Sequence, residues 1–352
     1  MNRKSNHTEW LDTLRAIATL GVIIIHVSSP LVNMAYGKNM GDWWIGNVVD
    51  SSVRFAVPLF LMLTGTTLLG KDSSLALFYK KRIFRVLLPF MFWILVYFCF
   101  RWFSLSTKFQ PVHPFDVMNW GFHLFLKEGV SKHFWYIYMI LFLYLFVPLM
   151  GKGLKQLSQK SILYILLTWM VCSYFFRTIP LNLYCWSGGY YSKLLGYFLH
   201  SGYLVLGYYL SKFSVPSIKI RWVAFLIFLI TVFISAFFSY YFSKLSHRIN
   251  LSIYSYLNLN TILQSIAIYI LFKDSLVKNR YLQAMRNTIN SYSFGIYLVH
   301  ILVIGLFFKF GIFWTMAHPL ISLPLVTLFT LISSFGLIWI LCKLPFGKYF
   351  AN

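Results

Sequence analysis

The stretch LDTLRAIATLGVIIIHVS, residues 11–28, decides the fold of this chain. As an α-helix it would cover about 27 Å, close to the roughly 30 Å hydrocarbon core of a bilayer. It is apolar except for a few residues, among which Asp12, Arg15 and His26 are charged or titratable. Such groups are costly inside a membrane and mark a functional site by default. The stretch therefore predicts a membrane-spanning helix that carries a functional site.

The composition of the whole chain indicates a membrane protein. Of its 352 residues, 59% are hydrophobic and only 11% are charged. A soluble domain carries about 25% charged residues, so this chain has too few to cover a water-facing surface. This excludes a soluble globular enzyme, a disordered chain and a secreted disulfide scaffold. The 4 cysteines form no C-x-x-C pair, and we predict neither a disulfide framework nor a metal site.

Ten apolar stretches are long enough, or nearly so, to cross the bilayer, and each should be a helix because lipid cannot satisfy an open backbone. The first is not a signal peptide, since Asp12 and Arg15 interrupt its apolar core. We therefore predict an all-α, polytopic helix bundle that forms a single transmembrane domain over residues 1–352. The predicted spans are 11–28, 53–69, 83–103, 134–150, 162–176, 194–210, 222–241, 259–272, 293–310 and 320–342.

The charge balance sets the orientation. The chain has 31 Lys and Arg against 8 Asp and Glu, a net charge of +23. Such an excess is typical either of nucleic-acid binding or of the bias of cytoplasmic loops towards cations. The low charged fraction favours the second interpretation, and we predict no nucleic-acid partner. With the N-terminus inside, inner segments hold 19 of the cations and outer segments 11, so both termini are predicted to be cytoplasmic.

The longest polar connections, 29–52, 104–133 and 177–193, are predicted to face outward. They are rich in Trp, Tyr and Gly, and include Trp43, Trp44, Trp120 and Trp186. These aromatic residues fit either an interfacial belt or a surface that stacks against sugar rings. The sequence alone leaves both interpretations open.

The polar residues of the first span share one face. Arg15 and His26 are eleven positions apart, which places them about 20° apart around the helix axis and about 16 Å apart along it. Asp12 can pair with Arg15. A polar packing stripe with a snorkelling arginine is the alternative, but His26 lies too deep to snorkel. An arginine suits a phosphate, and a histidine can take a hydroxyl proton and return it.

A second basic cluster lies in the predicted inner loop before the third span, at Lys80-Lys81-Arg82-Ile83-Phe84-Arg85. Arg82 and Arg85 face one side of a helix start because they are three residues apart. Four cations in six positions suit an anion with several phosphates. Anchoring of the topology and binding of lipid headgroups is the alternative.

Further polar residues occur near the ends of other spans. Arg54 lies at the outer start of the second span, and His133 and Trp135 open the fourth. Tyr297 and His300 share a face of the ninth span. A hydrogen-bonded packing histidine explains His133 or His300 as well as a catalytic one does. We find no deep carboxylate in another span to orient His26, so its partner is unassigned.

Five stretches in order resemble the acyltransferase family 3 of membrane proteins, over about residues 10–343. In one of them, VPLF…TG at 57–65, Thr64 stands where the family usually has serine. Within this family, the chain most resembles the branch that modifies surface polysaccharides, which includes the enterobacterial common antigen O-acetyltransferase. The features behind this resemblance are Arg54, His133 and the absence of a soluble extension. The five stretches are LDxLR…H (11–26), VPLF…TG (57–65), RxxR (82–85), FWY…Y…PL (134–149) and SFGIYLVH (293–300).

This resemblance implies an O-acetyltransferase of the bacterial cytoplasmic membrane. It would move an acyl group, most simply acetyl, from cytoplasmic acyl-CoA to a hydroxyl of a glycan or lipid-linked sugar. Acyl-CoA is then a co-substrate, and no bound cofactor is expected. His26 would be the catalytic base or acyl carrier, with Arg15 also catalytic. Arg15, Arg82 and Arg85 would bind CoA, and the supporting candidates are Asp12, Arg54, His133, Trp135, Tyr297 and His300.

Two other functions stay open. An exporter of a polysaccharide intermediate would use Arg15 and His26 as a proton relay. The absence of an inverted repeat in the sequence counts against this hypothesis. A non-catalytic helper in glycan assembly would need no acyl-CoA.

Overall fold

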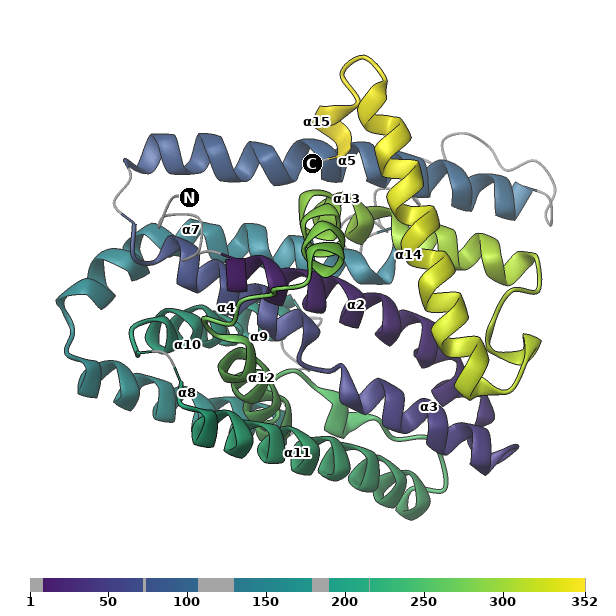
Figure 1. The fold of residues 1–352 in the computed structure, drawn as a ribbon, viewed down its shortest axis with the longest axis horizontal. Helices are drawn as coiled ribbons and strands as arrows, with labels where there is room; N and C mark the ends of the chain where they lie inside the picture. Colours follow the sequence, from purple (N-terminus) through teal and green to yellow (C-terminus); the bar gives the residue numbers. More distant parts are fainter. Residues whose placement is uncertain (1–8, 72–73, 107–129, 179–189, 215, 352) are drawn as a thin grey trace.

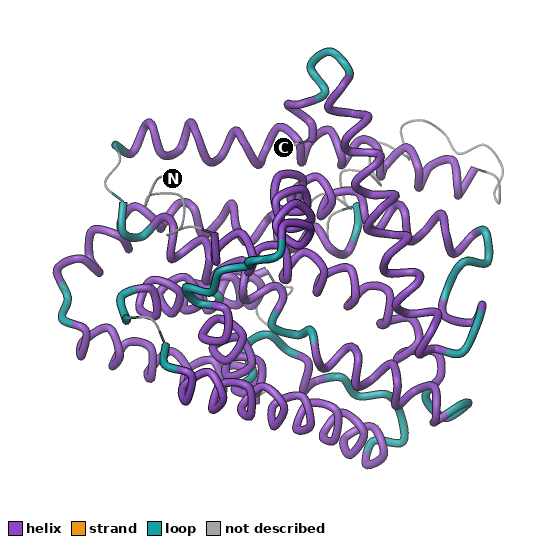
Figure 2. The backbone as a smooth tube through the Cα atoms, in the orientation of Figure 1, coloured by secondary structure: helices purple, strands orange, loops and turns teal. Residues whose placement is uncertain are grey.

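The computed structural model describes residues 9–71, 74–106, 130–178, 190–214 and 216–351. All regular structure in these ranges is helical, without strands (Figure 2). This confirms the predicted all-α fold. The helices are α2 (Glu9–Ala35), α3 (Met40–Ser52), α4 (Ala56–Leu68), α5 (Leu75–Ser106), η1 (Lys132–Phe134), α7 (Trp135–Gln156), α8 (Gln159–Thr178), α9 (Tyr190–Leu199), α10 (Ser201–Ser211), α11 (Ile218–Leu245), η3 (Ser252–Tyr254), α12 (Leu259–Phe272), α13 (Arg280–Lys309), η4 (Trp314–Met316), α14 (Pro319–Lys343) and α15 (Lys348–Ala351).

Every predicted span coincides with helix. The span predicted at 194–210 is divided at His200 into α9 and α10. Within the described ranges, 8 helical segments are long and apolar enough to cross a membrane, which makes this a multi-pass membrane protein. The segments at α8 and at α9–α10 are not among these. Ten spans and cytoplasmic termini therefore stay predictions.

The prediction of an open polar connection over 29–52 was wrong. The first helix continues to Ala35, and α3 then packs back against it. Trp43 on α3 is completely buried, and its Nε1 donates to the Val32 carbonyl at 3.1 Å. Trp43 is thus a packing residue and not a sugar platform. The predicted connections around 107–129 and 179–189, with Trp120 and Trp186, lie outside the described residues.

The helix α2 lies inside the bundle, in contact with α3, α4, α13 and α14 (Figure 1). Its neighbour α4 is held by very close packing against α10. A Cβ on Gly65 would lie 1.9 Å from the Leu204 carbonyl oxygen, and one on Gly207 would lie 2.0 Å from that of Met62. Small residues allow such close approach of helix backbones in membranes. This contact fixes α4 beside the candidate site.

The short C-terminal helix α15 returns to the bundle and packs on α5 (Figure 1). The Phe350 ring stacks on Phe92 at 4.6 Å, and Trp93 Nε1 donates to the Phe350 carbonyl at 3.0 Å. A Cβ on Gly295 of α13 would lie 2.5 Å from the Ala351 carbonyl oxygen. The end of the described chain is therefore a packed element that contacts both α5 and α13.

Candidate functional site

The polar stripe of α2 faces α13. Arg15 Nη1 lies 3.3 Å from Asp12 Oδ1, and it donates to Asn290 Oδ1 at 2.6 Å. Asn290 Nδ2 in turn donates to Asp12 Oδ1 at 2.9 Å. The predicted pairing of Asp12 with Arg15 is present. Sequence reasoning missed Asn290, because an amide at the start of an apolar stretch gives little signal by itself.

A cavity of about 460 Å³ opens beside this stripe, and all three arginines that the sequence singled out for an anion line it. Arg15 comes from α2, whereas Arg82 and Arg85 come from α5. Neither Arg82 nor Arg85 forms an ion pair within the described part of the chain. The neighbouring lysines of the basic cluster are exposed and do not line this cavity. The remaining lining is mostly neutral and includes Thr64, Thr67, Tyr136, Tyr144, Ser293 and Tyr297.

Two tyrosines form one wall of this cavity. The rings of Tyr136 and Tyr297 lie 5.7 Å apart, and the Tyr297 hydroxyl donates to the His133 carbonyl. The Tyr297 ring also lies 5.4 Å from the ring of His133 and 5.8 Å from that of His300. Tyr297 therefore separates the arginine-lined cavity from a group of histidines.

This group, the histidine cluster, consists of His26 on α2, His133 on η1 and His300 on α13. The ring centroids lie 5.2 Å apart for His26 and His300, 5.2 Å for His133 and His300, and 6.4 Å for His26 and His133. His133 and His300 are buried, at 3% and 0% exposure, whereas His26 is half-buried. The structure thus brings together three candidates that the sequence identified separately.

Hydrogen bonds orient the two buried rings. His300 Nδ1 lies 2.7 Å from the Tyr297 carbonyl oxygen, which can only accept, so this nitrogen carries the proton. His133 Nδ1 lies 2.9 Å from Ser131 Oγ, where either group can donate. The Nε2 atoms of His133 and His300 are buried and find no hydrogen-bond partner among the described residues.

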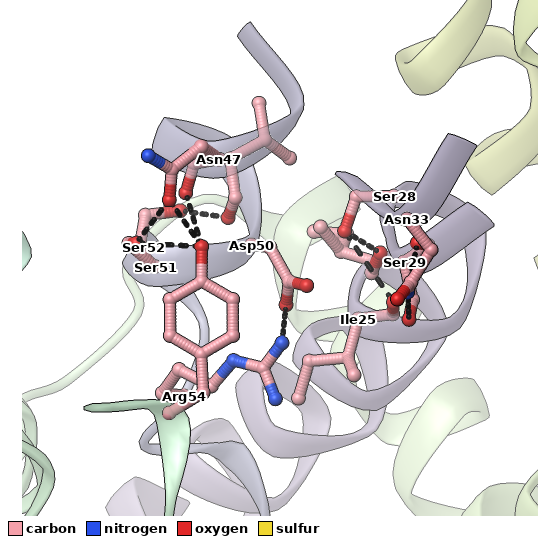
Figure 3. Close-up of polar contacts among 12 residues, drawn as sticks. Ile25, Ser28, Ser29, Asn33, Asn47, Asp50, Ser51, Ser52 and Arg54 are labelled. Atoms are coloured by element: carbon pink, nitrogen blue, oxygen red, sulfur yellow. Dashed lines mark hydrogen bonds and ion pairs between the residues drawn. The ribbon is translucent and has the colours of Figure 1, made fainter. Parts of the chain in front are cut away.

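A second polar cluster surrounds Arg54. Its guanidinium forms an ion pair with Asp50 of α3 (Figure 3). It also lies 4.1 Å from the centre of the Tyr254 ring. Asp50 is completely buried, so the expectation that no other span carries a deep carboxylate was wrong. It was missed because α3 was read as a loop. The ion pair accounts for the burial of Arg54, since a buried charge needs a partner.

Trp135 packs against aromatic residues outside the arginine cavity. Its ring stacks on Tyr256, at 5.7 Å and 17°, and lies 5.8 Å from His200. It does not belong to the described lining of the arginine cavity. Across the described residues, no group of three or more His, Cys, Asp or Glu side chains is arranged to hold a metal ion. The candidate site presents arginines, hydroxyl groups and imidazoles.

A family model described as an acyltransferase domain, of the acyltransferase 3 type, matches residues 8–343. The match covers nearly the whole chain and includes every candidate residue above. No curated protein and no solved structure gives a match to this chain.

Proposed function

The chain belongs to the acyltransferase 3 family of membrane acyltransferases, and from this premise we propose that it transfers an acetyl group from cytoplasmic acetyl-CoA to a hydroxyl of a surface or lipid-linked polysaccharide. The observation that carries the proposal is the adjacency of an arginine-lined cavity and a histidine cluster. The first suits a phosphorylated donor, and the second suits proton transfer. The proposal places the chain in the bacterial cytoplasmic membrane, in the branch that acts on surface polysaccharides.

The arginine cavity is the proposed donor site. Guanidinium groups bind phosphate through paired, charge-assisted hydrogen bonds. Arg82 and Arg85 are available for this role because no carboxylate of the described chain neutralises them. Arg15 is held in place by Asp12 and Asn290, so it enters the cavity in a fixed orientation. The phosphates of CoA would therefore lie at these three arginines, on the cytoplasmic side in the predicted topology.

The thioester must then reach His26. A rise of 1.5 Å per residue puts Arg15 and His26 about 16 Å apart along α2, a separation that requires an extended linker between phosphate and thioester. The pantetheine arm of CoA is such a linker. Tyr297 lies between the cavity and the histidine cluster, so its side chain has to turn aside, breaking its hydrogen bond to the His133 carbonyl.

In the proposed reaction, His26 takes the proton of the acceptor hydroxyl. The oxygen attacks the thioester carbonyl, a C–O bond forms, the C–S bond breaks, and the leaving thiolate takes the proton from His26. General base catalysis of this kind contributes roughly 10²–10⁴-fold. His26 as a transient acyl carrier is the variant of this mechanism, with the acyl group passing through an imidazole nitrogen. The acceptor would approach from the outer side, near Trp135.

The test is transfer of labelled acetyl from acetyl-CoA to extracted glycan by the purified protein in detergent. We expect transfer by the wild type and none by His26→Ala. His318→Ala is the matched control, because this exposed histidine occupies the N-cap position of α14 and is not in the cavity lining, and it should keep full transfer. Wild-type protein that consumes no acetyl-CoA would refute the proposal.

An exporter is the second candidate, favoured by the buried histidines, which could also relay protons. It predicts glycan movement into vesicles in the absence of acetyl-CoA. Uptake without acetyl transfer would replace the acyltransferase proposal with this one.

A further inference from the structure

A histidine that acts as a base needs a partner. One ring nitrogen has to present a lone pair to the substrate, and the other carries a proton that an acceptor must hold in place. Asp12 cannot be this acceptor for His26, because it lies about 21 Å away along the helix axis. Asp50 forms an ion pair with Arg54, and no hydrogen bond or ion pair among the described residues joins Asp50 to His26. The partner must therefore come from another group.

His300 offers the missing acceptor. Its Nδ1 proton is held by the Tyr297 carbonyl, so its Nε2 bears a lone pair. That atom is buried and has no hydrogen-bond partner in the described ranges. An unsatisfied buried acceptor is costly, and its presence in a polar cluster calls for a donor. The His300 side chain is 0% exposed, so it is closed to solvent.

The distances select His300 over His133. A ring nitrogen lies about 1.1 Å from the centre of its imidazole, so the 5.2 Å between the ring centres of His26 and His300 allows a hydrogen-bond distance of about 3 Å once two nitrogens face each other. The 6.4 Å between His26 and His133 allows no approach closer than about 4 Å even if two nitrogens face each other, which is too long for a hydrogen bond. The planes of the His26 and His300 rings are tilted by 51°, so the His26 imidazole must turn about its Cβ–Cγ bond to form the hydrogen bond.

We infer that His300 is the positioning residue of His26: its Nε2 accepts the N–H of His26 and thereby turns the other nitrogen of His26 towards the reacting hydroxyl. The inference rests on the proposed acyl transfer. When His26 takes the acceptor proton, its second N–H stays bonded to His300, and the proton then leaves with the thiolate. A neutral imidazole serves here where many enzymes use a carboxylate, because it adds no charge to the membrane interior.

The chain offers a chemically matched control in His200. This histidine is also buried, its Nδ1 lies 2.6 Å from the Gly196 carbonyl oxygen, and its Nε2 has no partner in the part of the chain that the structure describes. It differs from His300 in its neighbour, which is Trp135 and not His26. Substitutions at His200 therefore report the general cost of replacing a buried histidine of this kind.

The experiment compares His300→Phe and His300→Gln with His200→Phe and His200→Gln in the acetyl-transfer assay. Phenylalanine fills the space without an acceptor, whereas the glutamine side-chain oxygen can accept near the position of Nε2. We expect His300→Phe to lower kcat about 10–100-fold at unchanged KM for acetyl-CoA, as when the hydrogen-bond partner of an active imidazole is removed. His300→Gln should recover most of this loss, and both His200 variants should match the wild type.

Several outcomes overturn the inference. Equal losses in His300→Phe and His300→Gln, or a kcat of His300→Phe within about 2-fold of the wild type, would show that the acceptor atom has no role. If His300→Phe does not fold, as judged by thermal unfolding in detergent, His300→Met replaces it with the same expectation. An inactive wild type would instead refute the proposed function, so the two failures are distinguishable.

Discussion

Removing the two arginines that α5 contributes to the cavity should weaken CoA binding strongly. The change is Arg82→Ala together with Arg85→Ala, which deletes the two cavity cations that have no ion pair among the described residues. Arg15 stays in place through Asp12 and Asn290. The double variant therefore isolates the contribution of α5 to the site.

The expected loss of CoA binding free energy follows from how exposed each arginine side chain is. A hydrogen bond to a charged group contributes about 1.5–3 kcal/mol when it is shielded from water. Arg82 is half-buried, so we assign it about 2 kcal/mol, and the exposed Arg85 about 1 kcal/mol after solvent screening. The sum of about 3 kcal/mol corresponds to a roughly 100-fold rise in the Kd for CoA, at 1.4 kcal/mol per tenfold.

The assay is titration calorimetry with CoA on purified protein at low ionic strength, where screening is weakest. The matched control is Lys80→Ala with Lys81→Ala, which removes the same charge from the same basic cluster, at exposed side chains outside the cavity lining. We expect the lysine variant to bind within a few-fold of the wild type. Unchanged affinity in a folded arginine variant, or an equal loss in the lysine variant, would refute the assignment of the donor site.

Three further predictions address the anchor, the packing and the topology. Arg15→Lys keeps the charge but loses the planar fork that binds a phosphate through two hydrogen bonds, so kcat/KM for acetyl transfer should fall about 10–100-fold; wild-type kinetics would contradict this. Gly207→Ala should lower stability by about 1–3 kcal/mol, measured by thermal unfolding, because its Cβ would lie 2.0 Å from a backbone oxygen. Gly153→Ala, with no atom of the described chain within 4 Å, is its control and should not destabilise. A tag after residue 352 should be protected from labelling outside the cell, and a tag near residue 108 should be labelled; the opposite pattern would overturn the predicted topology.

Part of this structure could be predicted from the sequence because it depends on local patterns. Length and apolar content of each segment determined the membrane helices, since a lipid-embedded backbone has no stable alternative. The periodicity of the α-helix placed Asp12 next to Arg15, and the structure shows that pairing. Arg15, and separately the pair Arg82 and Arg85, were recognised from their local sequence as potential anion ligands, whereas the tertiary structure places them in one cavity. Each of these conclusions depends on residues within a few turns of one another.

The tertiary structure decided what depends on contacts between helices. The meeting of His26, His133 and His300 brings together residues from three elements more than a hundred positions apart, and no local periodicity encodes it. The role of Asn290 as a partner of Arg15 follows only from the packing of α13 on the polar face of α2.

The segment 29–52 was misread for the same reason. Its polar and aromatic composition is typical of a loop, but burial of Trp43 and the pairing of Asp50 with Arg54 make it a packed helix. A side chain that looks water-facing in the sequence is satisfied here by a partner from another turn or another helix, and only the assembled bundle supplies that partner.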